Sequence, residues 1–275
     1  MKIKKILVPF DFSECAENAL DFALEISKKT DAKLCLLNVS LMPIPYTEVN
    51  YYVDYGTLNE LEETMKEHLY KLKQRKPELL GAETETVQMI SVADGIIERT
   101  KAEDIDLIVM GTKGAKGFNE LFFGSHAAQV LRETEVPTLI VPEQYTQNQV
   151  TKIAFASDYN SLDDMNETGM LAELGRVFDA EIEIFNVNPT SEPISVEKAF
   201  EAAQLEDQLE QTQHSYHEIS NKNAEEGIMD YIASHKINML AMVPRRHSLI
   251  EELFKRSLTK KMALHLDIPL LVMHD

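Results

Sequence analysis

An internal duplication is the feature that most constrains the fold of this chain. The segment Met110–Pro142 aligns without a gap with the segment Met242–His274. Nearer the start of each half, ILVPFD at 6–11 matches IAFASD at 153–158. A fixed offset between long similar segments is the signature of a repeated structural unit. The sequence therefore predicts two copies of one domain, and a chain of 275 residues is long enough to hold both.

Each copy alternates apolar runs with helical patterns, and we expect the domains to cover residues 1–145 and 150–275. In the first copy the expected strands lie at 5–8, 33–39, about 85–90, 107–110 and 138–141. An acidic helical segment between them carries one apolar stripe, formed by Leu58, Leu61, Met65, Leu69 and Leu72. Continuous apolar strands separated by helices indicate parallel sheets with both faces covered. We therefore predict an α/β fold with two open, parallel, five-stranded sheets.

A glycine-rich loop follows the fourth expected strand of the first copy. Gly111 and Gly114 come directly after the apolar run that ends at Met110, and Gly124-Ser125 then opens a helical pattern. Glycine lets the backbone approach a ligand closely, and a helix N-terminus offers free N–H groups and a positive dipole end to phosphate. Ordinary turns and helix caps are the alternative interpretation. The loop favours phosphate binding because other segments converge on it.

Those other segments follow the first and second strands. Ligands bind beyond the carboxyl ends of the strands in an open parallel sheet. Pro9 and Asp11 follow the first strand, Val39 follows the second, and His126 is placed to offer its backbone N–H beside Ser125. The Asp11 carboxylate is suited to accept hydrogen bonds from ribose or adenine, and backbone groups near Val39 to read a base edge. An alternative for Asp11 is a helix cap, which leaves both roles open.

With these motifs the chain resembles the universal stress protein family over both halves, and in particular its tandem members. The ATP-binding subgroup is similar in having a glycine, two residues, a glycine, nine residues, then a glycine and a small hydroxyl residue, which here are Gly111, Gly114, Gly124 and Ser125. The resemblance implies a Rossmann-like strand order of 3-2-1-4-5 and contact between the fifth strands of paired domains. It also implies an adenine nucleotide (ATP, ADP or AMP) near Asp11 and Val39, with room for a divalent metal such as Mg²⁺ at the phosphates.

The second copy departs from this pattern at every glycine. Valine and two arginines replace the glycines, and only the serine is kept, so that the corresponding residues are Val243, Arg246, Arg256 and Ser257. Arginine side chains would fill the space that phosphates need, and valine resists a positive φ. We therefore expect one nucleotide, held by the first copy, beside a degenerate second copy with a structural or regulatory role. The same comparison suggests that the fold does not require the three glycines.

The primary hypothesis is thus a stress-response protein that binds ATP and hydrolyses it slowly at most. No positioned base with cationic support is found for fast phosphoryl transfer, so no catalytic residue is assigned. The alternative is an interaction module that works without nucleotide and binds an anion or a partner through the second copy. A basic cluster motivates it, although a solvated face explains that cluster as well: Arg245, Arg246, His247, Lys255, Arg256, Lys260 and Lys261. An adenylyl-transferring enzyme is disfavoured because its HxGH-type and SGGxDS-type motifs are missing.

Charge and composition exclude several other classes. A net charge of −19 disfavours binding to nucleic acid and to anionic membranes. No apolar run approaches the roughly 18 residues of a membrane span, and the run after the N-terminal lysines is shorter than a secretion signal needs. Cys15 and Cys35 lack metal-ligand and disulfide spacing. We expect a cytoplasmic protein.

A pair of histidines, His214 and His217, precedes Glu218 and would share one face of a helix. Two histidines without a further ligand make a weak metal site, and we expect no bound metal there.

The fifth strands, at 136–141 and 268–273, are apolar edges in each copy. Unpaired apolar edges tend to find a partner strand. We expect them to pair within the chain as an intramolecular pseudo-dimer. A homodimer of the whole chain is the further alternative.

Overall fold

The structure is a computed structural model, and it describes residues 2–42, 55–112, 125–145, 149–157, 165–188, 203, 205–206, 208–243 and 267–274. We refer to 2–145 as the first half and to 149–274 as the second half. The first half contains β1 (Lys5–Pro9), α1 (Glu14–Thr30), β2 (Lys33–Leu41), α2 (Tyr55–Arg75), η1 (Pro77–Leu79), β3 (Glu83–Met89), α3 (Val92–Ala102), β4 (Leu107–Thr112), α4 (Ser125–Glu133) and β5 (Thr138–Pro142). The second half contains β6 (Lys152–Ala156), α5 (Met165–Phe178), β7 (Glu181–Asn188), β8 (His214–Ser220), α7 (Ala224–His235), β9 (Met239–Met242) and β10 (Leu270–Val272).

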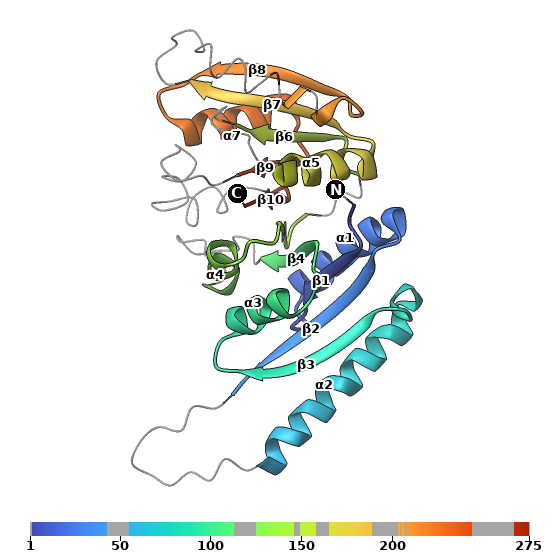
Figure 1. The fold of residues 1–275 in the computed structure, drawn as a ribbon. Coiled ribbons are helices and arrows are strands. Elements are labelled where there is room, and N and C mark those ends of the chain that lie inside the picture. Colours follow the sequence, from blue (N-terminus) through green and yellow to red (C-terminus); the bar gives the residue numbers. More distant parts are fainter. Residues whose placement is uncertain are drawn as a thin grey trace, which may run out of the picture.

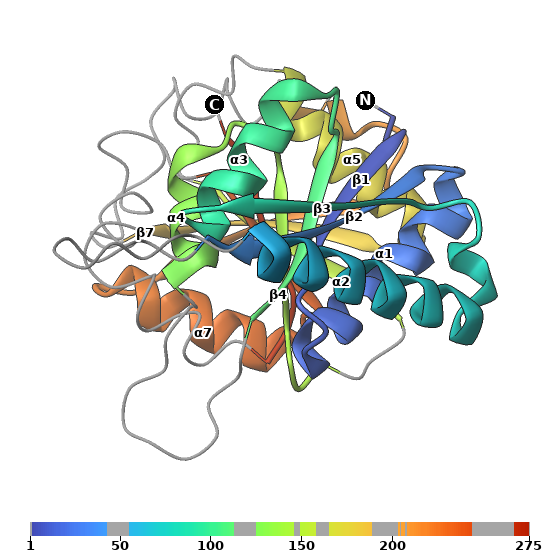
Figure 2. The same cartoon turned by 90° about the horizontal axis from the view of Figure 1, so that it is seen from below.

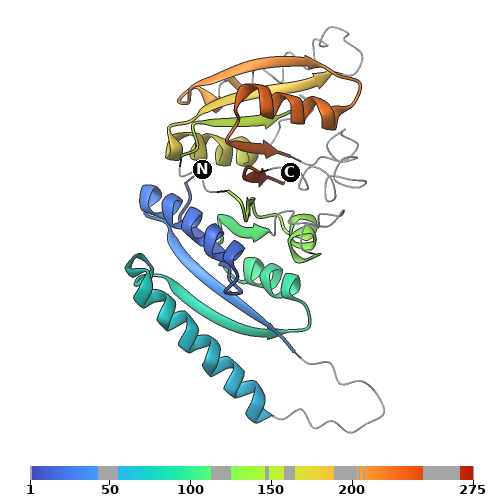
Figure 3. The same cartoon turned by 180° about the vertical axis from the view of Figure 1, so that it is seen from behind.

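The strands form one ten-stranded sheet in the order β3-β2-β1-β4-β5-β10-β9-β6-β7-β8 (Figure 1). Each half has the predicted 3-2-1-4-5 order, and every pair within a half is parallel. The two fifth strands, β5 and β10, pair antiparallel, with Leu139 opposite Leu271. The predicted five-stranded sheets therefore exist as two units that are joined edge to edge, and Figure 3 shows them following one another along a single sheet.

Helices cover both faces of this sheet because its strands are apolar on both sides. In β1, Ile6 and Val8 belong to one buried cluster and Leu7 to the other. The first cluster includes residues of α1, α2 and α5, and the second includes residues of α3, α4 and α7. Figure 2 shows α2 and α3 on opposite sides of β3. Of the expected stripe on α2, Leu69 and Leu72 are buried and Met65 is half-buried, whereas the side chains of Leu58 and Leu61 are not described.

Both clusters contain residues of both halves, so the chain has a core in common across the junction. Phe22 of α1 lies 5.5 Å from Phe178 of α5 and 5.8 Å from Tyr145, measured between ring centroids. The Lys29 ammonium lies 4.9 Å from the centroid of the Phe178 ring. Asn18 donates from Nδ2 to the carbonyl oxygens of Pro142 and Tyr145, at 2.8 and 2.9 Å. Burial raises the pKa of Tyr145 to about 12, so its hydroxyl is neutral at physiological pH.

Replacing Phe178 with leucine should lower the free energy of unfolding by about 2 kcal/mol. Leucine keeps an apolar side chain between the halves but removes the ring contact with Phe22 and the cation–π contact with Lys29, each of which contributes about 1 kcal/mol. Urea denaturation followed by circular dichroism measures the change. Leu80→Ala is the control, because the Leu80 side chain is 75% exposed and its loss should change little. An unchanged stability in Phe178→Leu would show that this contact does not hold the halves together.

Within the described residues, no helix is long and apolar enough to cross a membrane.

Candidate nucleotide site at the carboxyl ends of the strands

A cavity of about 400 Å³ opens at the carboxyl ends of β1, β2 and β4. The strands supply its floor, while the first turns of α1, α3 and α4 supply its walls. Its lining residues are Pro9, Phe10, Asp11, Cys15, Ala16, Leu37, Val39, Val92, Ile96, Met110, Gly111, Thr112, His126 and Ala127. The cavity lies where the strand order reverses around β1, the usual ligand position in an open parallel sheet.

Most of the predicted site residues meet in this cavity. Six of the nine line it, namely Pro9, Asp11, Val39, Met110, Gly111 and His126. Ser125 begins α4 beside it, although its side chain is not described. Gly114 and Gly124 lie outside the described residues. The structure therefore places the described part of the predicted set at one site, and the glycine loop stays a prediction.

The turn from β1 into α1 decides how Asp11 faces the cavity. Ser13 is the N-cap of α1, and its Oγ accepts a hydrogen bond from the Ala16 N–H at 3.3 Å. Asp11 lies two residues earlier, where its Oδ1 accepts from the N–H and the hydroxyl of Ser13, at 3.0 and 2.5 Å. The alternative in which Asp11 itself caps the helix is thus wrong. Asp11 instead holds the capping residue in place through Oδ1. Its other oxygen, Oδ2, accepts a hydrogen bond from none of the described residues.

The frame around the cavity is repeated in the second half. Asn38 donates from Nδ2 to the Phe10 carbonyl oxygen at 2.8 Å, and Asn186 donates to the Ser157 carbonyl oxygen at 2.7 Å. Backbone bonds to the neighbouring strand repeat as well, from the N–H of Phe10 and of Ser157. Because both halves keep these bonds, they belong to the shared fold.

A close backbone contact requires glycine at position 111, and the comparison of the two halves in sequence did not predict it. A Cβ on Gly111 would lie 2.5 Å from the carbonyl carbon of Cys15, and closer still to its oxygen. The end of β4 therefore touches the backbone at the start of α1, and only glycine fits between them. The inference that the fold does not require Gly111 is wrong for this half. In the second half Val243 is buried at the corresponding place, while residues 158–164, which follow β6, lie outside the described residues.

The cavity is apolar at its floor and polar at its rim. Leu37, Ile96 and Ala127 are buried, whereas Asp11 and His126 are exposed. An apolar slot with a few polar groups at its mouth is typical of small-molecule sites. Sequence reasoning missed most of the apolar wall, because residues such as Ile96 look like ordinary core positions. The N-cap signal SVAD before α3, in which the Ser91 Oγ accepts from the Asp94 N–H, is the one signal that could have placed α3 here.

At the carboxyl ends of β6 and β9 the second half is described only in part. Asp158, Arg246, Arg256 and Ser257, together with the rest of the basic cluster, lie outside the described residues. Val243 follows β9 and is 5% exposed. The sequence expectation for this end of the second half therefore stays a prediction.

The two histidines considered as a metal pair lie on a strand, which corrects the helix expected for them. In β8, His214 and His217 are three residues apart and so point to opposite faces of the sheet. His214 Nε2 lies 3.1 Å from Glu206 Oε2, whereas the His217 ring is 5.6 Å from that of Tyr231. Burial lowers the pKa of His214, but its contacts with the Thr212 carbonyl and Glu206 outweigh burial and raise it. Among the described residues, no group of three or more His, Cys, Asp or Glu could hold a metal ion.

Comparison with known proteins agrees with the duplication. The model of the universal stress protein family matches residues 2–142 and again residues 150–274. Universal stress protein MJ0531 of Methanocaldococcus jannaschii is 31% identical over 140 residues, which are 50% of this chain and 81% of that protein. Universal stress protein Slr1230 of Synechocystis is 24% identical over 295 residues, covering 98% of this chain and 99% of that protein.

A solved structure agrees in fold over the whole chain. The crystal structure of a universal stress protein from Archaeoglobus fulgidus has a TM-score of 0.71 and 19% sequence identity, and the match covers 98% of both chains.

Proposed function

The chain belongs to the universal stress protein family of stress-response proteins, and we propose that its first half binds one adenine nucleotide, ATP foremost, in the cavity at the carboxyl ends of β1, β2 and β4. The observation that carries this proposal is the convergence of residues from three strands and three helices on one cavity. Its volume, about 400 Å³, is in the range of small-molecule sites.

The chemistry of the lining fits the parts of a nucleotide. The adenine ring lies in the apolar slot beside Val39 and Ile96. The ribose hydroxyls donate to Asp11, whose Oδ1 accepts from Ser13 and whose Oδ2 accepts from none of the described residues. The phosphates extend toward the start of α4, where the N–H groups of the first turn have no partner within the helix and the helix dipole favours an anion. Gly111 then serves two purposes, because its lack of a side chain leaves room at the end of β4 both for the backbone of α1 and for the ligand.

A divalent metal fits this site only as an ion that the nucleotide brings. Mg²⁺ usually takes one or two carboxylates together with phosphate oxygens and water. Asp11 is the one carboxylate among the described lining residues, and the Thr112 hydroxyl is the one side-chain oxygen that β4 adds to that set. These residues would supply one or two oxygen ligands, and the phosphates would supply the others.

We further propose that hydrolysis is slow and that the second half supports or regulates the first. The described lining contains neither lysine nor arginine, so the described cavity lacks the cation that speeds phosphoryl transfer. The second half pairs with the first through β10, which lies antiparallel to β5. After β9, Val243 stands where the first half has Gly111.

Asp11→Asn should weaken ATP binding about tenfold without changing stability. Asparagine keeps an oxygen that can accept from Ser13, so the turn stays intact, but its amide nitrogen cannot accept from a ribose hydroxyl. Losing one charge-assisted hydrogen bond corresponds to a tenfold change or more. Isothermal titration calorimetry measures affinity and stoichiometry, with one site per chain expected. Asp21→Asn is the control, since Asp21 lies on α1 and pairs with Lys76 outside the cavity.

Two outcomes would count against the proposal. If the intact protein does not bind ATP, the chain works without nucleotide, as an interaction module. If both variants bind as the unaltered protein does, the nucleotide occupies another surface. Thermal unfolding of each variant separates a lost contact from a damaged fold.

A further inference from the structure

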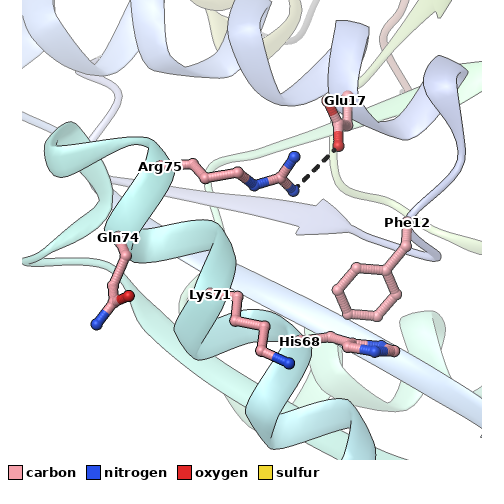
Figure 4. A pocket seen from close by; sticks show the side chains of 6 residues that line it. All are labelled: Phe12, Glu17, His68, Lys71, Gln74 and Arg75. Carbon is pink, nitrogen blue, oxygen red and sulfur yellow. Dashed lines mark hydrogen bonds and ion pairs between the residues drawn. The ribbon is translucent and has the colours of Figure 1, made fainter.

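A second cavity lies on the other side of the turn that carries Asp11. It has a volume of about 580 Å³ and is formed between the start of α1 and the second half of α2. Its lining residues are Phe12, Glu17, His68, Lys71, Gln74 and Arg75 (Figure 4). The two cavities share no described lining residue, because Asp11 faces the first and Phe12 faces the second.

Three basic side chains of α2 line this second cavity. His68, Lys71 and Arg75 are three and four residues apart, which places them on one face of the helix. Figure 4 shows Arg75 extending toward Glu17 of α1, and Gln74 turned away from α1. The lining thus holds two permanent positive charges, on Lys71 and Arg75, and one negative charge, on Glu17. An anion placed between these two cations gains attraction from both, although the net charge of the protein is −19.

Lys71 and Arg75 already form ion pairs, but these pairs are exposed and leave both cations accessible to a ligand. Lys71 pairs with Glu67 at 2.7 Å, with side chains that are 59% and 62% exposed. Arg75 pairs with Glu17 through one contact of 3.5 Å, and the Arg75 side chain is 64% exposed. Exposed pairs of this kind contribute little to stability. An incoming anion with bidentate geometry can therefore displace Glu17 from Arg75 at little cost.

Aromatic rings form the other wall of the cavity. The rings of Phe12 and His68 meet edge to face at a centroid distance of 5.4 Å. Phe12 has a φ of 63°, a left-handed conformation that is costly for a bulky residue. The bonds from Ser13 to Asp11 hold this turn, and the Phe12 ring also contacts Phe10 at 5.1 Å. The Phe12 ring is thus fixed at the mouth of the cavity, close to the cations of α2.

We propose that this second cavity binds a small aromatic anion. Its planar ring packs on Phe12 and His68, and its phosphate or carboxylate is held by Lys71 and Arg75. The site is separate from the nucleotide cavity, and it does not depend on the function proposed for that cavity. The turn at Asp11, Phe12 and Ser13 lies between the two sites.

Phenyl phosphate is the probe for the first test, with binding measured by ligand-observed NMR in the presence of saturating ATP. We expect Lys71→Gln/Arg75→Gln to weaken binding at least about tenfold, because two charge-assisted contacts are lost. Phe12→Leu should weaken it by a smaller factor. Lys66→Gln is the matched control, since Lys66 lies on the same helix and pairs with Glu63 at 3.2 Å, outside the lining. Its affinity should be unchanged.

The chemical class is tested with two simpler probes. Inorganic phosphate should bind more weakly than phenyl phosphate, and phenol should not bind measurably. Absence of phenyl phosphate binding to the unaltered protein would overturn the proposal, as would equal affinity in the double variant. If Asp11→Asn removed phenyl phosphate binding while the double variant kept it, the probe would be in the nucleotide cavity and the second site would be refuted. Failure of ATP binding alone leaves this test unaffected, since the variants can then be compared without ATP.

Discussion

Replacing Gly111 with alanine should lower the free energy of unfolding by about 3 kcal/mol in the absence of any ligand. The added Cβ would lie 2.5 Å from the carbonyl carbon of Cys15 and 3.1 Å from the Ala16 nitrogen, so backbone has to move. Backbone atoms cannot rotate away as the end of a flexible side chain can. Forced overpacking of this kind costs about 1 to 3 kcal/mol, and we expect the upper part of that range.

The matched control for this substitution is Gly81→Ala. No atom lies within 4 Å of a Cβ placed on Gly81, and its φ is outside the left-handed range. Its stability should therefore stay the same or rise slightly. Chemical denaturation of both variants measures the difference. If Gly111→Ala is as stable as Gly81→Ala, then the contact between β4 and α1 does not require glycine, and a ligand becomes the sole reason for Gly111.

This expected result changes how ligand binding should be tested. Gly111→Val copies the residue of the second half, but in the first half it would disturb the start of α1 before any nucleotide is considered. Loss of ATP binding in that variant would be ambiguous. Asp11→Asn avoids the problem because it keeps the oxygen that accepts from Ser13.

The fold was largely accessible from the sequence because its strongest signals are local and repeated. Apolar strands, helical stripes and the duplication predict the parallel units and the pairing of their fifth strands. The carboxyl ends of parallel strands meet at one edge, so Asp11, Val39 and Gly111 could be brought together without a structure. Their roles as ligand contacts stay a prediction.

Other features depend on contacts that no local pattern carries. The approach of the Cys15 backbone to Gly111 joins residues far apart in the chain. Ser13 rather than Asp11 is the N-cap because Phe12 between them adopts a left-handed backbone conformation. The residue type does not predict this conformation for phenylalanine. His217 was misplaced because the segment HSYHEIS is polar, although polar side chains alternate with others on an edge strand such as β8. The cavity at α2 was missed since its walls come from two helices.

The duplication also shows how the two halves differ at one buried position. Cys35 of β2 is matched in β7 by Glu183, and Arg99 of α3 is matched in α7 by Tyr231. In the first half Arg99 pairs with Glu85 and with Glu103, both at 2.8 Å. In the second half the carboxylate itself is buried. The Tyr231 hydroxyl donates to Glu183 Oε2 at 2.6 Å, and Lys152 pairs with Oε1.

Lys152→Met should therefore destabilise the protein by about 3 kcal/mol at pH 7. Methionine keeps the apolar stem but leaves Glu183, whose side chain is 3% exposed, without its cation. Breaking a buried pair costs about 3 to 5 kcal/mol, and the lower end applies because the Lys152 side chain is 35% exposed. The control Lys66→Met breaks an exposed pair with Glu63 and should cost well under about 1 kcal/mol.

The pH dependence distinguishes lost charge pairing from lost packing. Burial raises the pKa of Glu183, but hydrogen bonds from Lys152 and Tyr231 outweigh it, so the pKa lies below its usual 4.5. The pair thus stabilises the fold above that pH, and this contribution disappears as the pH falls through the folded-state pKa. Without Lys152 burial dominates, the pKa rises, and the variant loses stability as the pH increases. The difference between the two proteins, measured by urea denaturation, should grow from pH 4 to pH 7. A difference independent of pH would mean that Lys152 acts through packing alone.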